Sequence, residues 1–357
     1  MASNRLYFID ALRAFAILMM LQGHFISSLL APEWQQADST LYVLWKYCRG
    51  FTAPIFFTIT GWVFYFLLLR THVKGWKNPR IKKGLKRVLE LLLWGYLLRL
   101  NVWGLFSGTV NASFKYPDVL QIIALSVLFV ICCYLLLFRN KLLLGIFLGS
   151  MGVLIFCLEP LYAERTFSTI PTFLSAYLTK ANGGVFYLFP WLGYVCMGAV
   201  LGIIFQKKNV SPQRLRLSSF LFFILGILLV FKSSAFFMFL YNLLDVDLFR
   251  KIAYNNFLFI RLGDVFVLIA FFIAIRRVLK KSLWVFVGSK TLSLYIVHYF
   301  ILYGSLTGVS LYAYFGKQLT WVESVVGAIL FIIACYALVR FYPTIKRQFM
   351  RVMLYFR

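Results

Sequence analysis

The sequence predicts an all-α, polytopic integral membrane protein, and three observations predict it. Hydrophobic residues make up 62% of the 357 residues and charged residues only 13%, whereas soluble domains carry about 25% charged residues. The mean hydropathy is +0.84. Apolar stretches long enough to cross a bilayer recur along the chain, and the segments between them are alternately rich and poor in Lys and Arg. Together these features exclude an ordinary soluble domain.

About ten stretches reach the length that a membrane-spanning helix needs. We expect these spans at residues 5–30, 50–70, 88–106, 119–138, 142–158, 185–205, 217–239, 259–275, 283–306 and 321–341. The basic segments follow the second, fourth, sixth, eighth and tenth spans, so the positive-inside rule predicts that both termini are cytoplasmic. A miscount by one span would break this alternation.

The remaining composition narrows the class of protein further. A net charge of +26 could indicate nucleic-acid binding, but the basic residues lie between apolar segments instead of on a soluble fold, so topology explains the charge and no nucleic-acid partner is expected. The six cysteines lie mostly inside predicted spans without metal-ligand spacing, so neither a disulfide framework nor a metal site is expected. No linker or change of composition divides the chain, which we interpret as a single domain over residues 1–357.

The first span, RLYFIDALRAFAILMMLQGHFISSLL, carries polar groups that a lipid-spanning helix should avoid. Arg13 and His24 are eleven positions apart, which places them on nearly the same helix face about 16 Å apart. Asp10 precedes Arg13 by three positions and can pair with its guanidinium. Charge near the centre of a span costs at least ~2.5 kcal/mol, so such residues indicate a functional site. The alternative is structural: an ion pair near the membrane surface and a histidine hydrogen-bonded within the core.

Further polar residues lie in or beside the later spans. Arg80, Lys83 and Arg87 belong to a basic cluster predicted on the cytoplasmic side, where it can bind anionic lipid or the phosphates of a nucleotide-like donor; topology alone also explains it. Arg49, Arg99, Asp118 and His298 are candidates for contact with an acceptor on the outer side. Arg49 can instead reach lipid headgroups, and His298 can be structural.

Two other patterns inside the spans predict packing. Arg261 and Asp264 are three positions apart and are expected to form an ion pair. Gly198 and Gly202 form a small-xxx-small pattern, which predicts a face for close contact with another helix.

Arg13, ten intervening residues and His24, within FIDALRAFAILMMLQGH, resemble the opening signature of the transmembrane acyltransferase superfamily. The segments FTAPIFFTITGW, KGLKRVLELLLWG, DVLQIIALSVLF, YLFPWLGYVCMGAVLG and TLSLYIVHYF resemble successive landmarks of its branch related to heparan-α-glucosaminide N-acetyltransferase, which is also related to the acyltransferase 3 family. One departure is Ala14, where the family often has Gly. The resemblance covers most of the chain in the expected order.

The resemblance implies a membrane acyltransferase. Such an enzyme takes an acyl group, usually acetyl, from cytosolic acyl-CoA as co-substrate and delivers it to a hydroxyl or amine of a saccharide or lipid-linked acceptor, with no permanently bound cofactor. It implies that His24 is the catalytic candidate and that Arg13 is essential or supporting. We expect His24 to act as base, with an acyl-histidine intermediate as the competing route. Asp10 would orient Arg13, and Arg13, Arg80, Lys83 and Arg87 would hold the donor.

The alternative function is a secondary transporter or flippase. In it, Arg13, His24, Arg261, Asp264 and His298 would line a polar path and titrate during transport. A non-catalytic membrane scaffold would explain the packing but would leave His24 without a role. Expected partners are acyl-CoA, the acceptor and membrane lipids, and a homo-oligomer is left open. Composition and topology fit a bacterial inner membrane.

Overall fold

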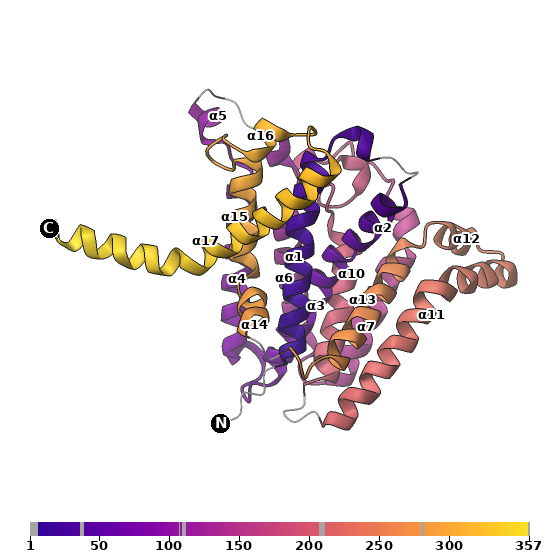
Figure 1. The fold of residues 1–357 in the computed structure, drawn as a ribbon. Coiled ribbons are helices and arrows are strands. Elements are labelled where there is room, and N and C mark those ends of the chain that lie inside the picture. The colour runs from indigo at the N-terminus through magenta and orange to yellow at the C-terminus, as the bar shows by residue number, and fades with distance from the viewer. Residues whose placement is uncertain are drawn as a thin grey trace. The chain divides into compact units, whose positions relative to one another are not determined.

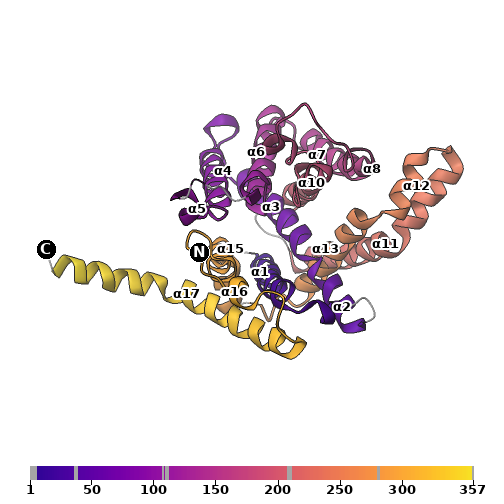
Figure 2. The same cartoon turned by 90° about the horizontal axis from the view of Figure 1, so that it is seen from above.

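The structure is a computed structural model, all-α, and it describes residues 6–35, 39–106, 108, 112–206, 211–279 and 282–355. The chain divides into two compact units, and Figures 1 and 2 label helices of both. The first unit comprises Met1–Ile9, Ala53–Arg99 and Asn111–Val278, and the second comprises Asp10–Thr52, Leu100–Val110 and Leu279–Arg357. The single domain over residues 1–357 stays a prediction. The predicted start of the first span at residue 5, and residues 207–210 and 280–281 of the predicted basic segments, lie outside the described residues.

The helices of the first unit are α3 (Thr52–Leu69, from Ala53 on), α4 (Pro79–Leu97), α6 (Val119–Leu137), α7 (Lys141–Cys157), α8 (Glu159–Tyr162), α9 (Thr172–Ser175), α10 (Leu188–Ile204), α11 (Pro212–Leu244), α12 (Asp247–Tyr254) and α13 (Phe257–Ala274). Those of the second unit are α1 (Tyr7–Leu29, from Asp10 on), α2 (Thr40–Arg49), α5 (Val102–Phe106), α14 (Ser282–Ser289), α15 (Thr291–Tyr303), α16 (Leu311–Phe315) and α17 (Trp321–Tyr355).

The described part of the chain contains six helices that are long and apolar enough to cross a membrane. A seventh candidate span results if α14 and α15, which are bent by 72° relative to each other, are counted together. The helices α7 and α10 are apolar but only 17 residues long. The protein is therefore an all-α, multi-pass membrane protein with six or seven candidate spans, while the number ten and the side on which the termini lie stay predictions.

The prediction of one helix over residues 88–106 is wrong. The Asn78 side chain accepts a hydrogen bond from the Arg80 backbone N–H at 2.9 Å, and Pro79 takes the first helical position, two features that start helices. Helix α4 therefore begins at Pro79 and ends at Leu97. Its first turns carry the basic cluster, and the residues after it form the separate short helix α5.

Glycine-mediated contacts bring the helices of the first unit close together. A Cβ atom at Gly202 would lie 2.7 Å from the Trp62 carbonyl oxygen of α3, and one at Gly198 would collide with the Thr58 carbonyl. The predicted small-residue face of α10 is thus confirmed. In the same way, α11 and α13 approach each other through Gly226 and Gly263. Helices that lack side chains at the contact gain dispersion between their backbones, which drives association inside lipid.

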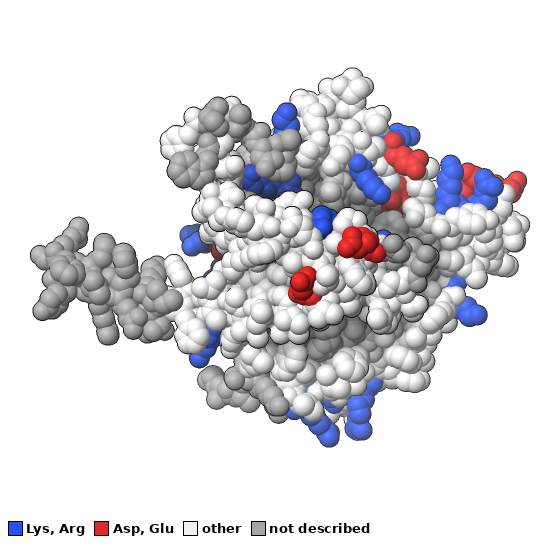
Figure 3. All heavy atoms as spheres, turned by 45° about the horizontal axis from the view of Figure 1, so that its top comes forward, with Lys and Arg blue, Asp and Glu red and all other residues white. Residues whose placement is uncertain are grey.

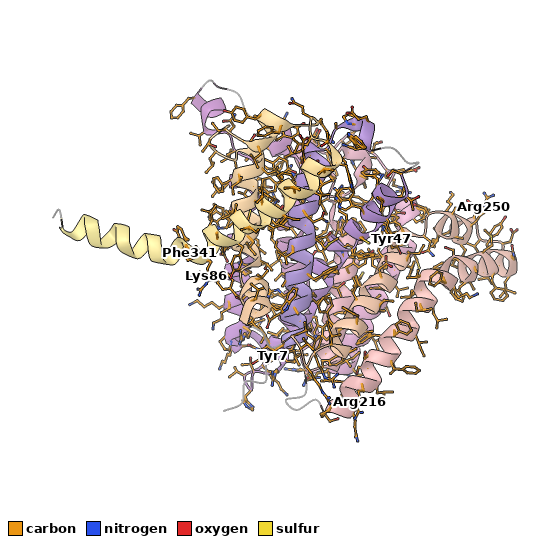
Figure 4. The ribbon with its side chains drawn as sticks, in the orientation of Figure 1. Tyr7, Tyr47, Lys86, Arg216, Arg250 and Phe341 are labelled. Atoms are coloured by element: carbon orange, nitrogen blue, oxygen red, sulfur yellow. The ribbon has the colours of Figure 1, made fainter. Side chains whose placement is uncertain are left out.

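Helix α11 presents most of its surface outward. Large apolar side chains along its length are exposed, among them Phe220, Phe231 and Phe239. Polar residues mark its two ends: Arg216 stands near its start and Arg250 lies just beyond its end on α12 (Figure 4). An exposed apolar surface between polar ends is typical of a lipid-facing helix.

The Gly198 contact gives a stability test. Gly198→Ala should lower the free energy of unfolding by ~1–3 kcal/mol, because the added methyl group forces α10 away from α3. Gly149→Ala is the matched control, since a Cβ there would lie an ordinary 3.8 Å from Val200 Cγ2. Thermal unfolding of the detergent-purified variants measures the difference. Equal stability of the two variants would contradict the close packing described above.

Candidate functional site

Helices α1 and α15 of the second unit lie side by side and are joined by two hydrogen bonds (Figure 2). Arg13 Nη2 donates to Thr291 Oγ1 at 3.1 Å, and His24 Nδ1 lies 3.0 Å from Tyr303 Oη. His24 follows Arg13 by eleven positions, and Tyr303 follows Thr291 by twelve. Because a helix rises about 1.5 Å per residue, both spacings are about 16–18 Å, so the two helices run parallel over this length.

A group of four polar side chains, which we call the His24 cluster, forms around His24. Tyr303 Oη lies 3.0 Å from Ser28 Oγ as well as from His24 Nδ1, so a hydrogen-bonded chain leads from Ser28 through Tyr303 to the imidazole. The fourth member is His298, whose ring centroid lies 5.3 Å from that of His24. His298 is fully buried, whereas His24 is half-buried. The Nδ1–H of His298 donates to the Tyr295 carbonyl, which fixes the proton on that nitrogen.

The position of Tyr303 depends on the way α15 ends. Gly304 follows it in the left-handed conformation, with φ +67°, and its N–H donates to the Phe300 carbonyl at 3.1 Å. A Cβ at this position would also lie 2.6 Å from the Val309 carbonyl oxygen. Glycine is therefore required here, because any other residue is strained at a positive φ and its Cβ would clash with the Val309 carbonyl oxygen. This turn makes Tyr303 the last residue of α15.

The Arg49 side chain lies beside α1 and packs against Gly23, the residue that precedes His24. A Cβ at Gly23 would lie 3.0 Å from Arg49 Cγ, and the guanidinium stands 5.7 Å from the centre of the Trp45 ring. Trp45 in turn donates from Nε1 to Gln22 Oε1 at 2.7 Å. The sequence prediction placed Arg49 near an acceptor, and the structure brings it close to the His24 cluster.

Lys317 adds a second cation at the same end of α1. Its Nζ donates to the Ser27 carbonyl at 2.6 Å, and its backbone N–H donates to the Ser28 carbonyl at 3.1 Å. Burial lowers the pKa of Lys317, and the neighbouring charge of Arg49 lowers this pKa further. Two basic side chains therefore lie around the end of α1 that carries His24.

The other end of the α1 segment in the second unit is tightly packed. Asp10 and Thr291 are each 8% exposed, and a Cβ at Gly288 of α14 would collide with the Asp10 carbonyl oxygen. Arg13 is half-buried and reaches Thr291 from this packed region. The Asp10–Arg13 ion pair stays a prediction.

The remaining predicted site residues belong to the first unit. Arg80, Lys83 and Arg87 lie on α4, where Arg87 pairs with Glu90 at 2.9 Å on the exposed surface. The cluster is thus carried by a helix, and any contact of these residues with a donor is a proposal.

Four of the residues singled out in the sequence form two ion pairs in the first unit. Arg99 forms an ion pair with Asp118 at 3.3 Å and donates to the Tyr116 carbonyl at 2.9 Å, while Asp118 caps α6. Arg261 pairs with Asp264 at 3.0 Å, as predicted. Each cation therefore lies against a carboxylate, which offsets part of the cost of burying both charges.

Sequence reasoning missed Tyr303, Ser28 and Lys317. Tyr303 lies within the predicted span 283–306, but its contact with His24 joins two helices far apart in the sequence, so no local pattern marks it. Ser28 follows His24 by four positions on the same helix, and this spacing could have found it. Lys317 reaches the end of α1 through a contact distant in sequence, which no local pattern shows.

The chemistry of the site is that of proton transfer. An imidazole hydrogen-bonded to a phenol, with cations nearby, can accept a proton and stabilise a developing oxyanion. Among the residues that the structure describes, no group of three or more His, Cys, Asp and Glu side chains could hold a metal ion.

Comparison with known proteins identifies the family. The family model described as heparan-alpha-glucosaminide N-acetyltransferase, catalytic, matches residues 5–243, more than half of the chain. No curated protein matches the chain. The matched region begins with α1, which carries Arg13 and His24, and it confirms the resemblance found in the sequence. The chain therefore belongs to the heparan-alpha-glucosaminide N-acetyltransferase catalytic family, a family of membrane enzymes that transfer an acetyl group from acetyl-CoA to an amine.

Proposed function

We propose that this protein transfers an acetyl group from cytosolic acetyl-CoA to an amine or hydroxyl of a saccharide or lipid-linked acceptor, with His24 as the general base. The single observation that carries the proposal is the hydrogen-bonded chain Ser28–Tyr303–His24, which lies on the helix that opens the family match. A polar chain of this kind, half-buried at His24 and Tyr303, is costly in a membrane unless it has a function.

The proposed proton path follows from the hydrogen bonds of His24. We assign the Nδ1–H of His24 as the donor to Tyr303 Oη and the Tyr303 O–H as the donor to Ser28 Oγ, so that Nε2 is the basic nitrogen. Nε2 takes the proton of the acceptor as its nitrogen or oxygen attacks the thioester carbonyl. When the carbon–sulfur bond breaks, the same proton passes to the leaving thiolate, and free CoA results.

The cations supply the electrostatic part of the proposal. Arg49, which is half-buried, and Lys317, which is exposed, can stabilise the negative charge that develops on the carbonyl oxygen, because both carry N–H donors with a positive charge. Arg13 lies about 16 Å along α1 from His24, a separation that only an extended molecule can bridge. CoA is such a molecule, so we assign Arg13, oriented by Asp10, to the donor. Arg80, Lys83 and Arg87 are further donor-binding candidates, and Arg99, Asp118 and His298 are acceptor-binding candidates.

The remaining parts of the proposal concern the whole chain. We propose ten spans with both termini in the cytoplasm of a bacterial inner membrane, and one catalytic domain that includes all 357 residues. The alternation of basic segments supports this topology.

One observation favours the transporter alternative. The α14–α15 pair is a broken span, bent by 72° beside Thr291, and broken helices often form ion or substrate sites in transporters. Release of CoA from acetyl-CoA by the purified protein separates the two functions, because a transporter does not cleave a thioester.

His24→Gln should lower kcat roughly 100-fold to 10,000-fold, because the variant loses the proton acceptor. The measurement is CoA release from acetyl-CoA with a panel of amino sugars and a membrane glycan extract. His72→Gln is the matched control, since His72 is exposed and lies outside the His24 cluster. A folded His24→Gln variant with the activity of the wild-type protein would refute the base assignment.

Rapid quenching with radiolabelled acetyl-CoA separates the two possible routes. Label that appears transiently on the wild-type protein but never on His24→Gln would establish the acyl-histidine route. Direct transfer leaves both proteins unlabelled while the acceptor gains the label.

Tyr303→Phe should lower kcat on the order of 10-fold to 100-fold while the KM for acetyl-CoA stays unchanged, because Tyr303 orients the imidazole without touching the donor. Steady-state kinetics at saturating acceptor measure both constants. Ser28→Ala should show the same pattern with a smaller effect, since Ser28 acts through Tyr303. A rise in KM with unchanged kcat would place Tyr303 at the donor instead.

Arg13→Gln should raise the KM for acetyl-CoA roughly tenfold, because a charged hydrogen-bond donor contributes ~1.5 kcal/mol or more to binding. Thermal unfolding must be measured beside the kinetics, since loss of one buried charge can also destabilise the protein. Thr291→Val is the comparison variant, because it removes the hydrogen bond to Arg13 but keeps the guanidinium. An unchanged KM in a folded Arg13→Gln variant would remove Arg13 from the donor site.

A further inference from the structure

The first unit contains a polar recess that the proposed reaction does not use. Its cavity volume is about 830 Å³, and it is lined by residues that follow α7 and by residues of α12. Its charged lining side chains are Glu159, Glu164, Lys180, Arg250 and Lys251, and Asn255 also lines it. Acidic and basic groups thus face one cavity, and Figure 3 shows Lys or Arg and Asp or Glu side chains next to one another at its right-hand edge, where Figure 1 places α12.

The recess lies at the level where candidate membrane spans end. Helix α11 ends at Leu244, α13 begins at Phe257, and the α12 residues of the recess lie between them. Glu159 comes two positions after the end of the apolar helix α7. Since the ends of spanning helices lie at the membrane–water interface, the recess lies at the depth of the lipid headgroups.

A buried carboxylate forms part of its wall. Glu159 is 6% exposed, and its Oε2 accepts a long hydrogen bond of 3.4 Å from Asn255 Nδ2. Burial raises the pKa of the Glu159 carboxyl, and the charge of Lys180 opposes this rise only in part. Burial thus disfavours the ionised form of the Glu159 carboxyl. A ligand with a cationic group that carries N–H donors would stabilise this form by charge and by hydrogen bonds.

The basic groups of α12 are held in place at the surface. Arg250 donates from Nε to Asp247 Oδ1 at 2.8 Å, and its Nη2 lies 2.7 Å from the same oxygen. Lys251 Nζ lies 3.2 Å from the other carboxylate oxygen, Asp247 Oδ2. These side chains are about half exposed. Arginine has more N–H donors than the two that Asp247 takes, so the guanidinium can also bind an anion.

The helix next to α12, α11, carries exposed apolar side chains. Near its end this helix exposes Phe236, Phe239, Leu243 and Leu244. Helix α12 packs directly against α11 and links this apolar surface to the charged lining. A ligand that fits both parts is amphipathic and carries a positive and a negative group.

We propose that the recess binds the headgroup of a glycerophospholipid with a primary ammonium, of the ethanolamine type. The ammonium donates hydrogen bonds to Glu159, the phosphate binds the basic side chains at the rim, and the acyl chains lie along the end of α11. The site is separate from acetyl transfer, so the proposal holds or fails independently of the role of His24.

Native mass spectrometry of the full chain with phosphatidylethanolamine, phosphatidylcholine and phosphatidylglycerol tests the proposal. The wild-type protein should bind phosphatidylethanolamine most tightly, since the quaternary ammonium of phosphatidylcholine has no N–H to donate. Glu159→Gln should weaken phosphatidylethanolamine binding at least about tenfold and leave phosphatidylcholine binding unchanged. Glu90→Gln is the control, because Glu90 pairs with Arg87 on α4 and lies outside the recess.

A second variant tests the phosphate contact. The double variant Arg250→Gln and Lys251→Gln should weaken binding of all three lipids to a similar extent.

The proposal would be overturned if the wild-type protein showed no preference for phosphatidylethanolamine, or if Glu159→Gln retained that preference. Binding of soluble phosphoethanolamine is measured in the same way. If it binds as tightly as the lipid, the ligand of the recess is a free zwitterion and not a lipid. Glu159→Gln should unfold at the wild-type temperature or above it, because burial raises the pKa of the Glu159 carboxyl and its ionisation therefore does not favour folding.

Discussion

The arrangement around α1 depends on one constraint: a polar side chain in lipid must find its partner within the protein. Arg13 and His24 satisfy it by binding the two ends of the same helix, α15. Because each hydrogen bond needs a particular separation along the axis, the pair fixes both the direction and the register of the two helices. Arg13 and His24 raise the free-energy cost of placing α1 in a membrane. The same two groups thus determine that α1 packs against α15.

The sequence predicted the helical class and the residues at the centre of the site, but not their mutual contacts. Periodicity placed Arg13 and His24 on one face, and the histidine in the later span marked α15. The Arg261–Asp264 pair and the Gly198 face were also predictable, because both depend on neighbours three or four positions apart. Tyr303 and Lys317 reach His24 or its helix from residues far along the chain, so no local rule could place them.

Errors in the predicted spans have a related cause. Hydropathy alone placed a helix over residues 88–106, although the helix start is determined by Asn78 and Pro79, both polar or turn-forming residues that hydropathy discounts. In the same way, the predicted span 283–306 is broken between α14 and α15. Apolar composition shows which residues lie in the membrane, whereas caps and bends decide where the helices begin and end.

In the proposed reaction, Lys317 presents a conflict between stability and chemistry. It has φ +60°, a conformation that costs a side-chain-bearing residue on the order of 1 kcal/mol and that glycine adopts freely. Glycine would relieve this strain and could keep the backbone bond to the Ser28 carbonyl, but it would remove the ammonium group from the end of α1. Selection for thermal stability alone would therefore favour glycine at this position, and selection for a cation beside His24 would oppose it.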